Sequence, residues 1–335
     1  MGLKIEKPGL LTTVQDLGRK GHQKEGVIVS GAMDALALRI GNLLMGNPEN
    51  TASLEMTLLG PVLSFTQDHV IAVTGANLSP KIDGEPIPLW RPILVKKGAR
   101  LSFSAPKTGG RAYLCVAGGL TVEPILGSAS TYLKAGFGGW HGKALAAGVE
   151  LETNTVSPEM LSFWQKLEGR LADKSYAASS WTPSAEVLPG YGLNPTIRAV
   201  RGPEYDWFTP ESKASFWQAP FQVTPQSDRM GFQLEGATLE LQKPQELLST
   251  AVTFGTVQVP SNGNPIVLLA DHQTTGGYPR IAQVITADLS KLAQTLPGQI
   301  LQFQEVSLEE AQYMYIKQER NLEKLKQTLS LTFKA

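Results

Sequence analysis

Short apolar runs separated by glycine, proline and polar residues dominate the hydrophobic pattern of this chain. The clearest runs are rich in Val, Ile, Leu and Thr, as expected for strands, and turn-forming residues lie between them. Long helices do not alternate with these runs, so a doubly wound parallel sheet is not expected. The pattern therefore predicts a mainly β protein of barrel or sandwich type. The expected strands are Val70–Thr74, Ile93–Val95, Leu101–Ser104, Ala112–Ala117, Thr196–Val200, Gly255–Val259 and Pro265–Ala270.

Three segments carry apolar residues at helical spacing. The first follows Ser30-Gly31 and is stopped at Pro48, and the second spans roughly Pro158–Arg170. The third begins at Ser307, where Glu310 completes a capping-box pattern, and is expected to run to about Thr328. Its apolar positions are Leu308, Ala311, Tyr315, Leu322 and Leu325.

The length of 335 residues is too great for one small core and fits two domains. The segment Ala172–Pro195 is rich in Ser, Ala, Pro and Gly, so a linker is expected there. We therefore predict a first barrel domain over residues 1–190, a second over residues 191–306, and a C-terminal helix over residues 307–335.

The charge balance excludes some binding partners, and the cysteine count favours one cellular compartment. Lys plus Arg and Asp plus Glu both number 30, so no net charge draws the chain to nucleic acid or anionic lipid. One cysteine, Cys115, rules out an internal disulfide and favours a reducing compartment. The N-terminus carries no signal-peptide pattern, and no segment approaches the ~20 apolar residues of a membrane helix. A cytoplasmic location is expected.

Several common site types are missing from the sequence. There is no G-x-x-x-x-G-K-[ST] phosphate loop, no G-x-S-x-G elbow, and no H-E-x-x-H or other short metal spacing among the four histidines. No metal site is therefore expected, and no lysine has the context of a biotin attachment site. Cys115 lies within an apolar strand and is interpreted as a small buried hydrophobe rather than a nucleophile.

The densest polar stretch is Gly255–Pro279, which is expected to form a strand, a turn, a second strand and a loop with adjacent glycines. Glycines let backbone N–H groups approach a ligand closely. Asp271 would act as a base or orient a substrate N–H, and Gln273, Thr274 and Thr275 would bind an amide or carboxylate. The alternative is an ordinary turn in which these side chains cap the backbone.

Three further residues have a functional and a structural interpretation. Arg229 suits a carboxylate or phosphate, or is a surface arginine paired with Asp228 or Glu235. Asp34 opens the first helix, where it belongs to an anion site or complements the helix dipole. Glu55, in an apolar strand, faces outward or is a buried acid.

A group of segments, taken in order, carries a resemblance to a known family: Ser30–Asp34, Leu54-Glu55, Thr74–Asn77, Arg111–Gly119, Gly127–Tyr132, Asp228–Gly231 and Gly255–Pro279. From about residue 3 to residue 305 the chain resembles the biotin-dependent carboxyltransferase-related family, also called the allophanate hydrolase subunit 2 family. Within it, the chain is similar to subunits of bacterial ATP-dependent 5-oxoprolinases. It is also similar to an antagonist that binds an inhibitor of the sporulation-initiating histidine kinase. The resemblance implies two cyclophilin-like β-barrel domains.

The resemblance also implies an activity and partners. The expected reaction is hydrolysis of 5-oxoproline to L-glutamate coupled to ATP hydrolysis. The chain would act in an assembly with the A and B subunits of the 5-oxoprolinase, of which the B subunit is the kinase inhibitor. The chain alone is expected to be inactive. One alternative is a non-catalytic protein that only sequesters the kinase inhibitor, and another is a urea-carboxylase-like carboxyltransferase component.

The resemblance suggests roles for individual residues. Arg229 would hold a carboxylate or phosphoryl group, and Asp271 and Glu55 would accept a hydrogen bond from the lactam N–H or deprotonate it. Residues expected to bind the planar amide or close the site are Asp34, Asn77, Gln258, Asn262, Gln273, Thr274, Thr275 and Tyr278.

Overall fold

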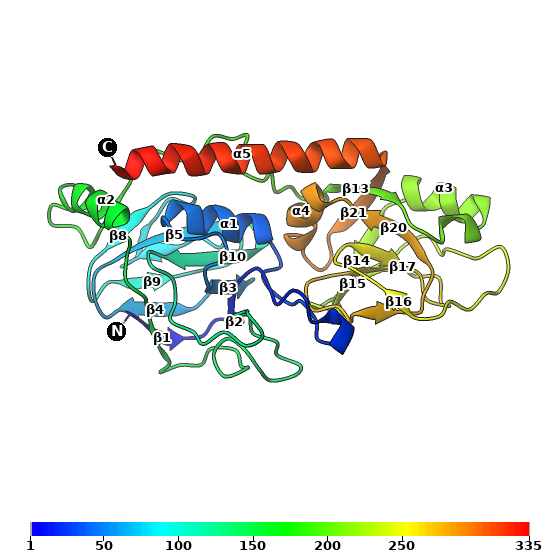
Figure 1. The fold of residues 1–335 in the computed structure, drawn as a ribbon, viewed down its shortest axis with the longest axis horizontal. Coiled ribbons are helices and arrows are strands. Elements are labelled where there is room, and N and C mark those ends of the chain that lie inside the picture. Colours follow the sequence, from blue (N-terminus) through cyan, green and yellow to red (C-terminus); the bar gives the residue numbers. More distant parts are fainter. Residues whose placement is uncertain (1, 335) are drawn as a thin grey trace. The chain divides into compact units, whose positions relative to one another are not determined.

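The protein is described by a computed structural model that covers residues 2–334 and divides into two compact units (Figure 1). Unit 1 comprises residues 2–19, Asp34–Pro189 and residues 320–334. Unit 2 comprises Lys20–Met33 and Gly190–Glu319. A short early segment of the chain therefore belongs to the second unit.

Unit 1 is built on two six-stranded antiparallel sheets, in the orders β11-β1-β4-β9-β6-β7 and β12-β8-β5-β10-β3-β2. Alternating strand residues such as Leu3 and Ile5 are fully buried in its core, which is the pattern of sheets with one face inward. The strands are β1 (Gly2–Lys7), β2 (Leu11–Gln15), β3 (Ser53–Thr57), β4 (Val62–Phe65), β5 (His69–Asn77), β6 (Lys81–Ile82), β7 (Glu85–Pro86), β8 (Ile93–Val95), β9 (Arg100–Ser102), β10 (Thr108–Val116), β11 (Glu150–Glu152) and β12 (Tyr176–Ala178).

Two of the predicted helices lie in unit 1. Helix α1 (Ala35–Leu44) packs on β5 and β10, and the Asp34 side chain caps it by accepting from the Ala37 N–H at 3.0 Å (Figure 1). Helix α2 (Pro158–Glu168) has Ser157 as its N-cap and proline in its first turn, and it ends two residues before the predicted end.

Unit 2 is a closed barrel in the order β13-β20-β17-β18-β15-β14-β21, in which β13 and β21 are parallel. Its core includes an aromatic cluster: the rings of Phe216 and Phe303 stack with centroids 4.7 Å apart, and Phe221 packs against both. A separate ribbon joins β16 to β19. The strands are β13 (Thr196–Arg201), β14 (Phe221–Val223), β15 (Gly231–Glu235), β16 (Thr250–Ala251), β17 (Thr256–Gln258), β18 (Ile266–Leu268), β19 (Thr275–Gly276), β20 (Arg280–Val284) and β21 (Ile300–Glu305).

Unit 2 also holds helical segments that the sequence pattern did not predict. Helix α3 (Pro210–Gln218) begins at the N-cap Thr209, and α4 (Leu289–Ala293) is a single short turn after a 3₁₀ segment, Thr286–Asp288. Two more 3₁₀ turns are Gln23–Glu25 and Tyr205–Trp207.

Helix α5 (Leu308–Lys334) begins as predicted and ends later. The Ser307 N–H donates to the Glu310 carboxylate at 2.8 Å and the Glu310 N–H donates to Ser307 Oγ at 3.1 Å, which completes the capping box. The expected end near Thr328 is too early, because Leu329 and Phe333 are also buried. Of the expected apolar positions, Leu308 and Tyr315 are exposed.

The mainly β fold predicted from the sequence is confirmed, with two six-stranded sheets in unit 1 and a closed barrel in unit 2. All seven expected strands occur, with ends shifted by up to four residues, and unit 2 closes into a barrel. Among residues 2–334, no helix combines the length and the apolar character needed to cross a membrane.

Candidate functional site

The loop after β18 starts with a buried ion pair in unit 2. Arg229 Nε lies 2.8 Å from Asp271 Oδ2, and Arg229 Nη2 lies 3.1 Å from Asp271 Oδ1. Ser30 Oγ donates to the same Asp271 Oδ1 at 2.7 Å, and Arg229 Nη2 donates to the Gly31 carbonyl at 2.6 Å. Both charged side chains are only 8% exposed. The cluster therefore joins three distant segments of the chain.

The local sequence explains why Arg229 lies opposite Asp271. The Asp228 carboxylate accepts from the Met230 N–H at 2.7 Å, which makes a tight turn around Arg229. Two backbone hydrogen bonds then align this turn with the end of β18: Leu269 N–H to the Met230 carbonyl at 2.9 Å, and Asp271 N–H to the Arg229 carbonyl at 2.8 Å. Side chain and main chain thus fix the same register.

This geometry changes the expected roles of the pair. The interpretation of Arg229 as a surface arginine paired with Asp228 or Glu235 is wrong, because its partner is the buried Asp271. Each side chain is the other's counter-ion in this arrangement, as is usual when charges are taken out of water. Arg229 as an anion ligand and Asp271 as a base both require this pair to open. As it stands, the pair positions the loop that follows.

A groove of about 920 Å³ lies beside that loop in unit 2. Two of the predicted ligand residues line it, Asn262 from the turn between β17 and β18 and Tyr278 from the end of the loop. Tyr278 is 47% exposed, and Asn262 uses its Oδ1 to accept from the Asn264 N–H at 3.1 Å. The volume of the groove is within the ~300–1,000 Å³ of small-molecule sites.

The loop residues between the ion pair and the groove differ in exposure. Gln273 and Thr274 are half-buried and Thr275 is exposed, so the three side chains are not all turned into the protein. The Thr274 carbonyl accepts from the Val252 N–H at 3.2 Å, which ties the loop to the segment before β17. The capped-turn alternative therefore accounts for part of this loop only.

Gln258 on β17 is 3% exposed, and its Oε1 has no hydrogen-bond partner among the described residues. That atom lies 3.0 Å from the position that a Cβ would take on Gly276. The predicted residues Gln258, Asn262, Gln273–Thr275 and Tyr278 thus all belong to unit 2, where Gln273–Thr275 and Tyr278 lie in or next to β19.

The other predicted residues lie in unit 1. Glu55 is buried, and its Oε2 accepts from the Tyr113 hydroxyl at 2.7 Å; the Tyr113 oxygen accepts from the Asp34 N–H at 2.8 Å. Burial, with Glu55 and Asp34 nearby, raises the pKa of Tyr113 well above its usual value. Asn77 is apart from them and caps a turn, with its Oδ1 accepting from the Ser79 N–H at 2.9 Å. Glu55 is thus a buried acid and Asp34 a helix cap.

Sequence reasoning missed two members of these clusters, Tyr113 and Ser30. Both lie within segments that the sequence singled out, but their partners are distant in the chain: Tyr113 bonds to a strand 58 residues away, and Ser30 to a loop 241 residues away. The buried character of Cys115 is confirmed, and burial raises its pKa to about 12, so it is a poor nucleophile at neutral pH. Within residues 2–334, no three His, Cys, Asp or Glu side chains gather in a way that would hold a metal ion.

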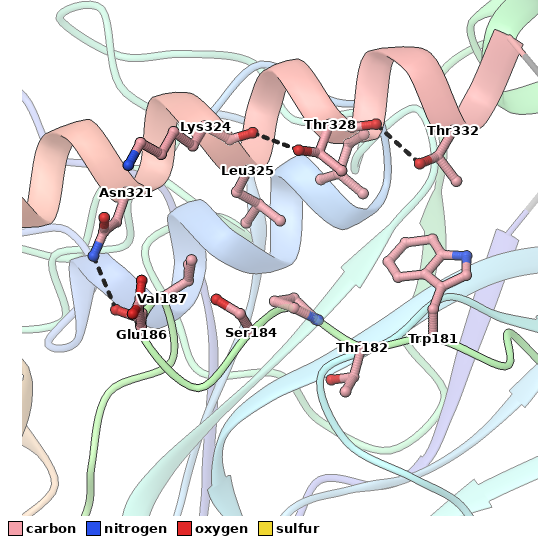
Figure 2. A pocket seen from close by; sticks show the side chains of 12 residues that line it. Trp181, Thr182, Ser184, Glu186, Val187, Asn321, Lys324, Leu325, Thr328 and Thr332 are labelled. Carbon is pink, nitrogen blue, oxygen red and sulfur yellow. Dashed lines mark hydrogen bonds between the residues drawn. The ribbon is translucent and has the colours of Figure 1, made fainter.

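Another cavity, of about 340 Å³, lies in unit 1 between α5 and residues from Trp181 to Val187 (Figure 2). Its polar side chains are largely engaged: Asn321 Nδ2 donates to the Glu186 carbonyl at 3.1 Å, and the hydroxyls of Thr328 and Thr332 donate back to helix carbonyls at 2.9 Å (Figure 2). None of the predicted site residues lines this cavity. The candidate site is therefore the region around β19.

Comparison with known proteins places this region in a family. A family model described as "Carboxyltransferase domain, subdomain A and B" matches residues 25–305. The chain belongs to this carboxyltransferase family. The matched range contains the ion pair, the β19 region and the Glu55–Tyr113 pair, whereas α5 follows it.

Two curated relatives in this family are similar over nearly their whole length. The C subunit of the 5-oxoprolinase of Escherichia coli strain K12 is 42% identical over 327 residues, which is 96% of this chain and 97% of the relative. The C subunit of the 5-oxoprolinase of Haemophilus influenzae is 40% identical over 315 residues, 94% of each. The resemblance drawn from the sequence is thereby confirmed.

A solved structure supports the fold at the level of both units. The crystal structure of the Kluyveromyces lactis urea amidolyase matches 97% of this chain with a TM-score of 0.86 and 29% identity. The chain spans only 20% of that much longer protein. The fold of this chain is thus shared with part of a longer protein, the urea amidolyase.

Proposed function

We propose that this chain is one component of an ATP-dependent 5-oxoprolinase that hydrolyses 5-oxoproline to L-glutamate together with the A and B subunits of that enzyme. The observation that carries the proposal is the 40–42% identity, over nearly full length, to the C subunits of two 5-oxoprolinases. The β19 region, with its groove and its amide and hydroxyl side chains, suits a small planar amide.

The chemistry explains why ATP is needed. A lactam carbonyl is a poor electrophile, and transfer of a phosphoryl group from ATP to its oxygen creates a good leaving group. One water then adds at the former carbonyl carbon and the C–N bond breaks as the nitrogen gains a proton, which leaves an acyl phosphate. A second water displaces phosphate from this acyl phosphate and gives the glutamate carboxylate. This chain has no Walker-type phosphate loop, so any ATP site in it would use other residues, and the proposal places ATP in the assembly without assigning it to one subunit.

The residues of this chain would bind and orient rather than form covalent intermediates. In this proposal, Asn262 and Tyr278 form walls of the groove that holds the lactam. Gln258, Gln273 and Thr275 donate or accept hydrogen bonds at its amide group. Arg229 and Asp271 act as positioning residues that hold the start of the loop. Glu55 and Asp34, tied to Tyr113, maintain the first unit.

The decisive experiment is co-expression with the A and B subunits and measurement of 5-oxoproline-dependent ADP release. We expect turnover by the complete assembly and none by this chain alone. The variants Asp271→Ala and Arg229→Ala should each lower the rate at least tenfold, while Asp206→Ala, whose side chain is 90% exposed, should not. An assembly that forms but releases no ADP in response to 5-oxoproline contradicts the proposal.

The proposed assembly also has a regulatory consequence. If the B subunit inhibits a sporulation histidine kinase, its capture by this chain relieves that inhibition by mass action. Kinase autophosphorylation in the presence of the B subunit should recover as this chain is added. Recovery with Arg229→Ala, together with no turnover by the wild-type mixture of all three subunits, would favour the purely regulatory alternative. Avidin-sensitive activity would instead indicate a urea-carboxylase-like component.

A further inference from the structure

A second ion pair lies at the other end of the loop that begins at Asp271. Arg280 is the first residue of β20 and directly follows Tyr278 and Pro279, which line the groove. Arg280 Nε lies 2.8 Å from Glu204 Oε2, and Arg280 Nη2 lies 2.7 Å from Glu204 Oε1. The Arg280 side chain is 17% exposed and that of Glu204 is 8% exposed. The loop is therefore held at each end by an arginine that is paired with a carboxylate.

Arg280 also holds the β16–β19 ribbon, whose second strand lies within this loop. Arg280 Nη1 donates to the Ala251 carbonyl at 3.1 Å, and Ala251 pairs with Thr275 across the ribbon. The ribbon is not part of the barrel sheet, and an isolated two-stranded ribbon has little stability of its own. One guanidinium group therefore joins the ribbon to Glu204, which lies in the turn after β13.

The backbone around this pair brings the turn that carries Glu204 close to Arg280. Strand β20 has an extra residue, Ile281, opposite β17, and such bulges re-aim side chains and are frequent next to active sites. The Gly202 N–H donates to the Ile281 carbonyl at 2.9 Å. A Cβ on Gly202 would lie 2.2 Å from the Arg280 carbonyl oxygen, so the turn can approach β20 this closely only with glycine at position 202.

The energetics of a buried ion pair favour a positioning role over a stabilising one. Removing two charges from water costs about as much free energy as their attraction returns, and a well-packed apolar pair is often at least as stable. What the pair supplies is direction, because the planar guanidinium group binds a carboxylate at two points and keeps a further N–H for a carbonyl. Burial acts to raise the pKa of Glu204, but the hydrogen bonds from Arg280 outweigh burial and hold that pKa below its usual value. Glu204 therefore stays ionised at neutral pH.

We propose that Arg280 and Glu204 are positioning residues of the candidate site, which fix Tyr278 and the β16–β19 ribbon so that the groove keeps its shape in the absence of a ligand. This inference rests on the proposed function, in which the groove holds the lactam. A site that is already ordered binds its ligand without the free-energy cost of ordering a loop. Loss of the pair should therefore weaken the binding of 5-oxoproline and leave the chemical step unchanged.

The first test compares KM with kcat in the complete assembly. Arg280→Lys keeps the charge but cannot bind Glu204 and the Ala251 carbonyl together, so we expect it to raise the KM for 5-oxoproline about fivefold. The kcat and the KM for ATP should stay at the wild-type values. Glu204→Gln keeps the shape of the carboxylate, so its effect on KM should be smaller. The control Arg201→Lys, in the exposed pair of Arg201 with Glu305, should change nothing.

A double variant separates positioning from folding. Glu204→Met combined with Arg280→Met replaces the ion pair with an apolar pair, which should keep the barrel folded and still raise the KM for 5-oxoproline. A KM that rises in neither the double variant nor Arg280→Lys, with or without a fall in kcat, would mean that the pair only maintains the fold. That result would overturn the inference and leave the proposed function intact.

The second test follows amide hydrogen exchange in the full chain and does not depend on turnover. The Val252 N–H donates to the Thr274 carbonyl beside the ribbon, and the Val259 N–H donates to the Pro279 carbonyl at the end of the loop. Both amides should exchange about tenfold faster in Arg280→Lys, while the amides of β15 and β18 keep the wild-type rate. This result supports the inference even if the wild-type assembly shows no 5-oxoproline turnover, which would count against the proposed function only. Unchanged exchange at both amides, or equally faster exchange throughout the barrel, would overturn the inference.

Discussion

At the scale of single residues, burial decides which charged groups keep their expected chemistry. Arg229 and Asp271 lie 42 positions apart in the chain, and both appeared in the sequence as candidates with separate roles. Folding makes them each other's partner, because two charges at 8% exposure are stable only when they neutralise one another. A sequence identifies such residues by type and by their turn-forming neighbours, but it does not reveal the distant partner that redefines them.

His69 on β5 gives a pH-dependent prediction. It is 2% exposed, and burial, partly offset by a hydrogen bond with the Gly2 backbone and by the charge of Asp68, lowers its pKa from 6.5 to about 4. As the pH falls, His69 therefore takes up a proton near pH 6.5 in the unfolded chain but only near pH 4 in the folded chain. The contribution of neutral His69 to the free energy of unfolding should be fully present above pH 6.5. It should be lost as the pH is lowered to 4, by about 3 kcal/mol at most.

Thermal unfolding between pH 4 and pH 7 measures this effect. The variant His69→Gln should unfold with a shallower dependence on pH in this window, and the exposed control His141→Asn should keep the wild-type slope. Identical slopes for His69→Gln and the wild type would show that His69 does not carry the loss of stability.

At the scale of elements, α1 shows how a rule for isolated helices reverses in context. Gly41 lies in the middle of α1, and replacing a mid-helix glycine with alanine at an exposed position stabilises by about 1 kcal/mol. Here a Cβ would lie 2.5 Å from Cys115 Sγ and 2.9 Å from Thr74 Oγ1. We therefore expect Gly41→Ala to destabilise unit 1 by roughly 1–3 kcal/mol through overpacking.

A double-mutant cycle tests the cause of this reversal. Cys115→Ala removes the closest atom, so Gly41→Ala should cost less in the Cys115→Ala background than in the wild type, as measured by denaturant unfolding. If the two substitutions are additive, the contact between helix and strand is not what selects glycine at position 41.

The elements also differ in how well a sequence predicts them. The helix α1 was predictable because Leu36, Ile40, Leu43 and Leu44 fall on one face and all are buried. Helix α3 carries a Thr209-Pro210 start signal but is only weakly amphipathic, with Ser212 and Phe216 its buried residues. Its position is set by packing on β21. Tertiary packing, rather than local pattern, determines such elements.

At the scale of the whole molecule, length and strand punctuation predict two mainly β domains, but they do not predict which segments belong to which compact unit. Residues 20–33 belong to unit 2 although they precede most of unit 1. Ser30 and Gly31 join unit 2 through hydrogen bonds to Asp271 and Arg229, which no local pattern indicates. The candidate site was predictable as a set of residue types in one stretch of sequence, and its arrangement was not.

Each unit has a hydrophobic core of its own, and a matched pair of substitutions tests their independence. Phe65 in unit 1 and Phe303 in unit 2 are both 1% exposed and lie in separate core clusters. Replacing either phenylalanine with alanine should lower the free energy of unfolding of its own unit by about 3–5 kcal/mol. We expect Phe65→Ala to speed amide hydrogen exchange in β5 and β10 and not in β17 and β20, and Phe303→Ala to do the reverse. Faster exchange in all four strands in both variants would mean that the two cores open as one cooperative unit, and that a ligand bound at β19 stabilises the first barrel as well.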